Sequence, residues 1–102
     1  MQAQQYTDGV AISAIWEAKP GEEDAVAGIL ARLGEAARTE PGVKLFLVHR
    51  GATDPEQFMF YELFEDEAAF AAHQQTAHFK ALVLEQGLPK LMKRERVQYS
   101  VL

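Results

Sequence analysis

The chain has 102 residues, 48% of them hydrophobic and 25% charged, with a formal net charge of −5 at pH 7. This length suits one domain with one core, and the composition is that of a folded protein. A net negative chain repels phosphate, which argues against nucleic acid as a partner. Because the sequence has no cysteine, disulfides, thiolate nucleophiles and cysteine-ligated metals are excluded, and we expect a cytoplasmic protein.

Neither a membrane span nor a signal peptide is predicted from the sequence. No apolar run reaches the length of a membrane span, and the polar first residues lack the plan of a signal peptide, so we expect no membrane partner. We interpret residues 1–8 as a flexible tail and residues 9–102 as a single domain. Residues 90–96 form the one basic cluster, which we interpret as a solvated helix end leading into a strand.

The first half of the chain alternates between strand and helix patterns. Residues 10–17 alternate and are rich in β-formers, which predicts a strand. Acidic residues followed by apolar residues at spacings of three and four predict a helix over 21–38, and the Glu-Pro-Gly at 40–42 ends it. Strands are predicted at 43–50 and 57–64, and the turn residues between them indicate a hairpin.

Two capping residues mark the helices of the second half. Asp66 can cap a helix over 67–73, and Thr76 can cap a third helix that ends at Gly87. Alternating apolar residues predict a last strand over 96–102. The order β-α-β-β-α-α-β predicts an α+β, ferredoxin-like split βαββαβ fold, in which a four-stranded antiparallel sheet has its helices on one face.

The third predicted strand has apolar side chains on both faces. Phenylalanines alternate with Met59, Tyr61 and Leu63, whereas a sheet with one face in water should alternate apolar and polar residues. The predicted helices are enough to cover only one face of the sheet. We therefore expect a homodimer in which the second face packs against a second copy; the alternative is that the alternation fails by chance.

Three histidines are candidates for chemistry. His73 and His78 are five residues apart, which is not the spacing of two ligands on one helix face, so we expect no metal site, although Glu62 could complete one. The structural alternatives are that His73 caps the end of the second helix and that His78 lies on the surface. We interpret His49 as structural or exposed.

Glu62 is the polar exception on the aromatic face of its strand. A carboxylate there is costly unless it is paired. Two interpretations stay open: an ion pair or hydrogen bond that only satisfies it, or a role in orienting a histidine or binding a substrate hydroxyl. No phosphate-binding loop, dinucleotide fingerprint or nucleophile elbow is present, and we expect no cofactor. An apolar substrate pocket between sheet and helices is expected to involve Trp16, Phe60, Phe64, Phe70, Phe79 and Leu82.

Residues 61–82 resemble the signature of the antibiotic-biosynthesis monooxygenase (ABM) family, Y-E-x-(W/Y/F)-x-D-x-x-A-(hydrophobic)-x-x-H-x-x-T-x-H-(F/Y/M)-K. The matching positions are Tyr61, Glu62, Phe64, Asp66, Ala69, Phe70, His73, Thr76, His78, Phe79 and Lys80. Residues 18–23 and 40–42 resemble the family's entries to its first helix and second strand. The resemblance implies a ferredoxin-like fold and a dimeric α+β barrel of facing sheets.

The activities of this family diverge. Some members are cofactor-free oxygenases of quinols or polyketide phenols, others degrade heme, and one group acts on the phosphorylated autoinducer-2 signal. The heme degraders place a ligand histidine shortly after the Phe-Lys pair, where this chain has Ala81, Leu82 and Val83, so heme degradation is disfavoured. Ala77 replaces the family's usual proline. The resemblance is to the quinol-monooxygenase-like branch.

The function expected from this resemblance is a cofactor-independent monooxygenase that oxidises a small aromatic quinol or polyphenol with O2. A deprotonated phenol can itself give an electron to O2, so the protein supplies a base, an apolar pocket and exclusion of water. One alternative is an isomerase or lyase acting on a small sugar-like signalling metabolite of the autoinducer-2 type, which would require a basic pocket. The other is a non-catalytic dimeric binding module.

Helix ends suggest different roles for the two histidines. His78 lies near the start of the third helix, where the positive end of the dipole opposes protonation, and we expect it to be the base. His73 ends the second helix, where the charged form is favoured, and we expect it to be a cation near the developing anion. Glu62 could hold either ring.

Overall fold

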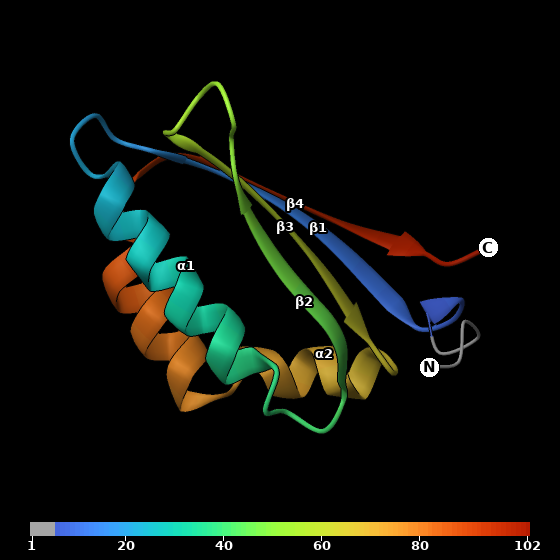
Figure 1. The fold of residues 1–102 in the computed structure, drawn as a ribbon. Coiled ribbons are helices and arrows are strands. Elements are labelled where there is room, and N and C mark those ends of the chain that lie inside the picture. Colours follow the sequence, from blue (N-terminus) through green and yellow to red (C-terminus); the bar gives the residue numbers. More distant parts are fainter. Residues whose placement is uncertain (1–5) are drawn as a thin grey trace.

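The computed structural model describes residues 6–102, which form one sheet and a layer of helices (Figure 1). The elements in chain order are β1 (Val10–Ala18), α1 (Glu23–Ala37), β2 (Val43–Arg50), β3 (Gln57–Phe64), α2 (Glu67–Gln74), the π-helix η2 (Phe79–Gly87), the 3-10 helix η3 (Leu88–Lys90) and β4 (Leu91–Ser100). Among these residues, none of the helices is long and apolar enough to cross a membrane.

The predicted tail, residues 1–8, is described only in part, since residues 1–5 lie outside the described residues. At its inner end, Asp8 forms an ion pair of 2.6 Å with Lys44 of β2. This contact joins the start of the chain to the sheet just before β1.

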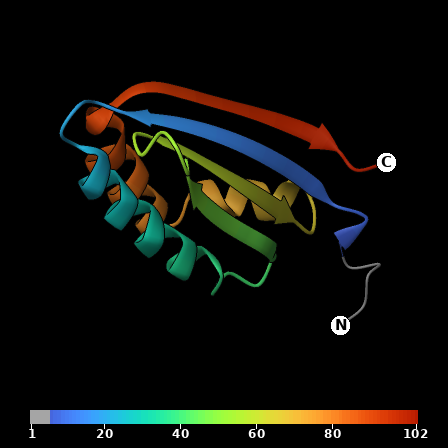
Figure 2. The same cartoon turned by 45° about the horizontal axis from the view of Figure 1, so that its top comes forward.

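The sheet has the strand order β2-β3-β1-β4, and all neighbouring strands are antiparallel. The helices α1, α2 and η2 lie on one side of it, and no element formed by residues 6–102 covers the other side (Figures 1 and 2). This confirms the predicted α+β, ferredoxin-like arrangement. Strands β2 and β4 are the edges, so side chains of β4 reach the helix layer from the rim of the sheet.

The core forms where the two central strands face the helices. Trp16 of β1 pairs with Phe58 of β3, and Ala14 pairs with Phe60; all four side chains are buried. From the helix side, α1 contributes its apolar stripe, including Leu30 and Leu33. The three-and-four spacing of apolar residues in the sequence is therefore the stripe that packs on the sheet.

The side chains that alternate along the strands with those facing the helices point to the uncovered face of the sheet. Leu47, Met59, Val97 and Tyr99 lie there with 41 to 54% of their surface exposed. Large apolar side chains at this exposure, on neighbouring strands of one sheet, form an unusual surface for an isolated chain. The two-faced apolar pattern predicted from the sequence is present in the structure.

The last strand corrects a prediction. It begins at Leu91 rather than at residue 96, so most of the basic cluster at 90–96 is strand and not a solvated helix end. The backbone of these residues pairs with β1, with Arg94 opposite Trp16 and Arg96 opposite Ala14. Pairing with a buried strand outweighs the weak strand preference of charged residues, because the side chains of this edge strand from Met92 to Ser100 stay exposed.

The third helix is capped as predicted but winds differently. The Thr76 hydroxyl accepts a hydrogen bond of 3.1 Å from the Phe79 backbone and donates one of 2.8 Å to the His73 carbonyl. The helix then continues as η2 with π-type winding, a form associated with local functional constraints. Gly87 ends it against Trp16, since a Cβ there would lie 2.8 Å from Trp16 Cη2.

Candidate functional site

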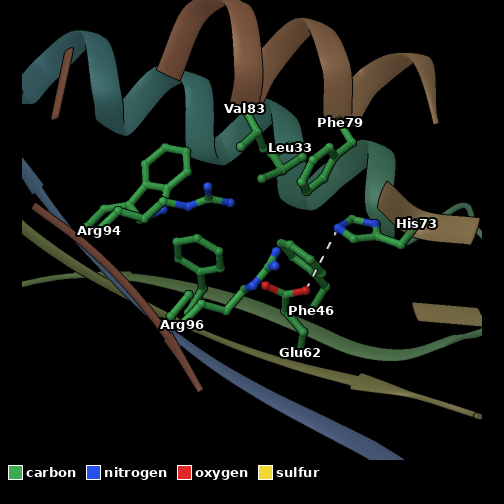
Figure 3. A pocket seen from close by; sticks show the side chains of 11 residues that line it. Leu33, Phe46, Glu62, His73, Phe79, Val83, Arg94 and Arg96 are labelled. Carbon is green, nitrogen blue, oxygen red and sulfur yellow. Dashed lines mark ion pairs between the residues drawn. The ribbon is translucent and has the colours of Figure 1, made fainter. Parts of the chain in front are cut away.

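A small pocket lies between the sheet and the helices, with Arg94 and Arg96 of β4 among its lining residues (Figure 3). Its lining side chains are Ala14, Trp16, Leu33, Phe46, Phe60, Glu62, His73, Phe79, Val83, Arg94 and Arg96. The walls are mostly aromatic or aliphatic, and four ionisable groups face the interior. The free space is about 10 Å³, which corresponds to roughly one water molecule.

Glu62 enters the pocket from β3, one of the two central strands of the sheet. It is paired in register with Ile12 on one side and Phe46 on the other, and only 4% of its surface is exposed. Burial raises the pKa of its carboxyl to about 7; Arg96 and Arg94 oppose the rise, and Glu40 adds to it. Near neutral pH this side chain therefore exists both as an acid that can donate a proton and as a carboxylate that can accept one.

His73 enters the same pocket from the last turn of α2 and is 1% exposed. Its ring lies among those of Phe46, Phe64 and Phe79, at centroid distances of 5.2 to 5.4 Å. Burial lowers the pKa of His73, and the hydrogen bond to Glu40 acts in the opposite direction. Burial thus acts against the charged form that was expected for His73 from its place at the end of a helix.

Glu40, in the turn between α1 and β2, holds both histidines of the signature. Its Oε2 lies 2.9 Å from His73 Nδ1 and 2.6 Å from His78 Nε2, and its side chain is 12% exposed. From the sequence, Glu40 was interpreted as part of a helix stop and of the family's entry to its second strand, and not as a site residue. The available signal was an acid immediately before Pro-Gly in a segment that resembles the family, but its distance in sequence from His73 gave no hint of contact.

The hydrogen bond to Glu40 also determines which nitrogen of His73 faces the pocket. A carboxylate oxygen only accepts, so Nδ1 carries the hydrogen and Nε2 of the neutral ring keeps its lone pair. That Nε2 faces Glu62 Oε1 at 3.8 Å (Figure 3, dashed line). The separation is too long for a direct hydrogen bond, but a substrate oxygen to one side of the gap could lie within hydrogen-bond distance of both groups and exchange protons with them.

His78 occupies a different position from His73. Its side chain is 24% exposed and does not line the pocket. It contacts the site through a hydrogen bond to Glu40 and through its ring, which lies 6.3 Å from that of His73. Glu62, His73 and His78 are thus brought near one another, with two of them in the pocket and the third behind Glu40. His49 lies exposed at the end of β2, as expected.

One group of side chains in residues 6–102 has the composition of a metal site. The ligand atoms of Glu40, His73 and His78 lie within 4.8 Å of one another, so the carboxylate that would complete a site is Glu40 and not Glu62. Two hydrogen bonds already join these atoms through a single oxygen. A divalent ion would have to displace both bridging hydrogens.

Arg94 and Arg96 were missed as pocket residues. They alternate on β4 and both point toward the helices, and the Arg96 guanidinium lies 5.6 Å from the centroid of the Phe70 ring. Burial lowers the pKa of Arg94, with Arg96 acting in the same direction and Glu62 opposing. The sequence signal was the i, i+2 spacing of two arginines, which has meaning only once residue 94 is assigned to a strand.

The predicted substrate-binding residues separate into two groups. Trp16, Phe60 and Phe79 line the pocket. Phe64 and Phe70 pack with Val10 and Ile12 in a second cluster, and Leu82 packs on the outside of the main core. Four apolar lining residues were not predicted: Ala14, Leu33, Phe46 and Val83.

Comparisons with known proteins agree with this architecture. A comparison with curated proteins finds no match. Among solved structures, the PA3566 protein of Pseudomonas aeruginosa is 26% identical with a TM-score of 0.87, covering 93% of this chain and 95% of that one. An antibiotic biosynthesis monooxygenase is 26% identical with a TM-score of 0.84, covering 91% and 98%. A conserved protein of Methanosarcina mazei Go1, 22% identical with a TM-score of 0.86 over 97% and 98%, supports the fold alone.

The family itself is assigned by its sequence model. The model described as antibiotic biosynthesis monooxygenase matches residues 9–84, which includes β1, the Glu40 turn, both histidines of the site and most of η2. This span is well over half of the chain, and it contains Glu62 and His73. The chain therefore belongs to the antibiotic biosynthesis monooxygenase family.

Proposed function

We propose that this chain is a cofactor-independent monooxygenase that oxidises a small aromatic quinol or polyphenol with O2. The proposal rests on one observation above all: His73 is fixed at Nδ1 by Glu40, and its free Nε2 faces Glu62 in a pocket with aromatic walls. A buried, neutral, oriented imidazole is suited to accept a proton from a phenol. Membership of a monooxygenase family supports the reaction class.

The proposed reaction balances without an external reductant. One quinol and one O2 give one hydroxyquinone and one water. The quinol loses four electrons, which reduce O2 completely: one oxygen atom enters the ring and the other leaves as water. The substrate itself therefore takes the place of a redox cofactor.

The proposed steps use the lone pair of His73 Nε2 twice. It first removes the proton of a substrate hydroxyl, and the resulting anion passes one electron to O2. The two radicals combine, forming a bond between oxygen and a ring carbon. When the O–O bond breaks, the distal oxygen leaves as water with the hydrogen of that ring carbon and the proton that His73 returns.

The other ionisable groups of the pocket have supporting roles in this proposal. Protonated Glu62 can donate a hydrogen bond to a second substrate oxygen, and the guanidiniums of Arg94 and Arg96 can stabilise the anion. A free space of about 10 Å³ does not admit an aromatic ring. Entry therefore requires movement, and the long side chains of Arg94 and Arg96, on an edge strand, are the parts of the wall best able to move.

In this proposal the base is His73, whereas the sequence analysis favoured His78. His78 does not line the pocket, and its hydrogen bond to the site is made to Glu40, although its ring also lies 6.3 Å from that of His73. We assign it a positioning role, in which it restrains Glu40 and, through Glu40, the ring of His73. Glu40 bonds to His78 on one side and to His73 on the other, so the three side chains form a chain of contacts from the surface to the buried site.

The homodimer is part of the proposal. The apolar side chains of the uncovered sheet face are best covered by the same face of a second copy, which would bury them on both chains. Two facing sheets would also give the dimeric α+β barrel that the family resemblance implies.

A second candidate function is favoured by one observation. Arg94 and Arg96 supply the basic pocket that an isomerase or lyase of a phosphorylated sugar would need. Against it, the remaining walls are aromatic and aliphatic, with few groups to bind sugar hydroxyls. The alternative of a non-catalytic binding module is less favoured, because binding alone does not require an oriented pair of proton-transfer groups such as His73 and Glu62.

The test is oxygen uptake with a panel of hydroquinones, using metal-free buffer with EDTA. We expect uptake of one O2 per quinol, and protein without flavin or heme absorbance. His73→Gln should lower the rate by at least about a hundredfold, while His49→Gln, at an exposed histidine of β2, should match the wild type. Turnover of a sugar phosphate with no oxygen uptake from any quinol would replace the proposed function by the second candidate.

A further inference from the structure

The two arginines of the pocket lie in an electrostatic setting that differs from the rest of the chain. The chain has a net charge of −5, yet Arg94 and Arg96 place two positive charges in one small pocket. Among the described residues neither guanidinium forms an ion pair with a carboxylate, although other cations do, such as Lys44 with Asp8. The pocket therefore has an unpaired positive end.

Glu62 does not neutralise this pair. It lies close enough for both arginines to favour its ionised form, but burial is the larger effect and raises its pKa to about 7. At neutral pH Glu62 is protonated in part of the molecules. Its negative charge therefore does not balance the two positive charges of Arg94 and Arg96. Two guanidiniums in this state, on exposed residues at the edge of the sheet, favour an anion from outside.

The spacing of the two arginines suits a carboxylate. As residues i and i+2 of one strand they lie about 7 Å apart along β4 and project to the same side. Two guanidinium forks at this spacing can converge on one carboxylate, each donating to one of its oxygens. Figure 3 shows Arg94 and His73 at opposite ends of the pocket, with Glu62 and Arg96 between them.

The walls of the pocket between these two ends suit an aromatic ring as ligand. Trp16, Phe60, Phe46 and Phe79 line the middle of the pocket, and Trp16 and Phe60 meet edge to face at 5.4 Å. A flat ring fits such walls better than a sugar does. A ring with an acid group at one end and a hydroxyl at the other would reach the arginines and His73 together.

We propose that the substrate is an aromatic acid, a quinol or polyphenol that carries a carboxylate, which Arg94 and Arg96 bind while its reacting hydroxyl faces His73. This inference rests on the proposed function and specifies the substrate class of the same site. The arginines then act twice: they select the acid, and they neutralise the negative charge that the substrate brings into a buried pocket.

The experiment separates binding from oxidation by using a probe that O2 does not oxidise. Calorimetric titration compares 4-hydroxybenzoate with 4-hydroxybenzamide, which has the same shape without the charge. We expect the acid to bind at least about tenfold more tightly than the amide. Arg94→Gln and Arg96→Gln should each reduce this preference, and the double variant should remove it.

A matched control is available on the same strand. Lys93 is next to Arg94 on β4, so Lys93→Gln removes one positive charge without changing the pocket; it should keep the preference for the acid. Thermal melting of each variant confirms that it is folded. Arg94→Lys, which keeps the charge without the fork, should bind the acid with intermediate affinity.

The possible outcomes distinguish the inference from the function. Equal affinity for acid and amide, no binding of either at millimolar concentration, or an undiminished preference in the double variant overturns the inference. Ribose 5-phosphate binding more tightly than 4-hydroxybenzoate also overturns it, in favour of a sugar phosphate. If the protein oxidises uncharged quinols and shows no preference for aromatic acids, only the inferred substrate class is wrong. If it binds aromatic acids but consumes O2 with no quinol, the proposed monooxygenase function is wrong.

Discussion

His73 Nε2 and Glu62 Oε1 face each other across 3.8 Å in the interior of the protein, and no hydrogen bond joins them. Both side chains are at least 95% buried. Burial lowers the pKa of His73 and raises that of Glu62, so it favours the neutral form of each group. A neutral base and a neutral acid on two sides of a gap are arranged to accept a proton from one substrate oxygen and to donate one to another.

The first prediction compares the two histidines. His73→Gln should lower kcat with a quinol by about a hundredfold or more, because it removes the lone pair that accepts the proton. His78→Gln should cost only about tenfold, because it loosens Glu40 without removing the base. Steady-state oxygen uptake for the two variants is the measurement. A loss in His78→Gln that equals or exceeds that in His73→Gln would assign the base to His78, as the sequence analysis expected.

The second prediction concerns Glu40, which orients His73. Glu40→Gln removes the negative charge that raises the pKa of His73 and leaves a weaker, neutral hydrogen-bond acceptor, so this pKa should fall further. Since the base must be neutral, the acidic limb of the kcat/KM profile should move to lower pH while the plateau drops. Glu40→Asp, which keeps the charge, should restore part of the plateau. An unchanged acidic limb in Glu40→Gln would show that the titrating base is a different group.

The third prediction is a pH dependence of stability due to Glu62. Its pKa is raised from 4.5 to about 7, so between these values the folded state binds more protons than the unfolded state, and stability falls as the pH rises. The full effect is roughly 3 kcal/mol. His73, whose pKa is lowered from 6.5, acts in the opposite direction below that value.

The contribution of Glu62 is isolated by subtraction. Urea unfolding of wild type and Glu62→Gln from pH 4.5 to 8 should give a difference that grows with pH in favour of the variant, because glutamine has no charge to bury. Glu65→Gln, at an exposed acid of the following turn, is the matched control. A difference that is constant over this range would mean that Glu62 is ionised at the same pH in the folded and unfolded states.

The fold was largely predictable because its signals are local. Alternation in the strands, the three-and-four spacing of α1, and the caps at Asp66 and Thr76 depend on neighbouring residues, and the observed elements follow them. The site was predictable only in part. Glu62 and His73 were found because a polar residue stands out in an aromatic row and because a family signature contains them.

The residues that were missed depend on contacts between distant segments. Glu40 reaches His73 across 33 positions of sequence, and its role cannot be inferred from its neighbours. Arg94 was excluded by an error in one boundary, since charged residues do not indicate a strand unless its pairing partner is known. The winding of η2, with a glycine against Trp16, is likewise set by tertiary packing.

The fourth prediction tests that packing. A Cβ at Gly87 would lie 2.8 Å from Trp16 Cη2 and 2.9 Å from the Leu82 carbonyl oxygen, so Gly87→Ala should cost about 1–3 kcal/mol by overpacking. Gly28→Ala is the control, because the nearest atom there is the end of the Arg32 side chain at 3.6 Å. Because Gly28 lies within α1, Gly28→Ala should instead raise the free energy of unfolding by about 0.5–1 kcal/mol. Equal effects in chemical denaturation would contradict the predicted contact.

The fifth prediction concerns the uncovered face of the sheet. Light scattering at micromolar concentration should give twice the chain mass of 11.4 kDa, because the apolar residues of this face are covered in a dimer. Met59→Asp, in the centre of the face, should give the mass of one chain, since it would bury an unpaired charge in the interface. Leu84→Asp is the control: Leu84 is similarly exposed, at 47% compared with 41% for Met59, but lies on η2.

These two variants separate dimerisation from general surface effects. Both add one negative charge at an exposed apolar residue, so any effect of net charge or solubility should be shared, whereas loss of the dimer should occur only in Met59→Asp. The pocket lies on the opposite side of the sheet from Met59, so a monomeric Met59→Asp that still binds 4-hydroxybenzoate would show that the binding site is complete within one chain. A wild-type protein that scatters as a monomer, or a Met59→Asp variant that remains a dimer, would mean that this face is not the interface.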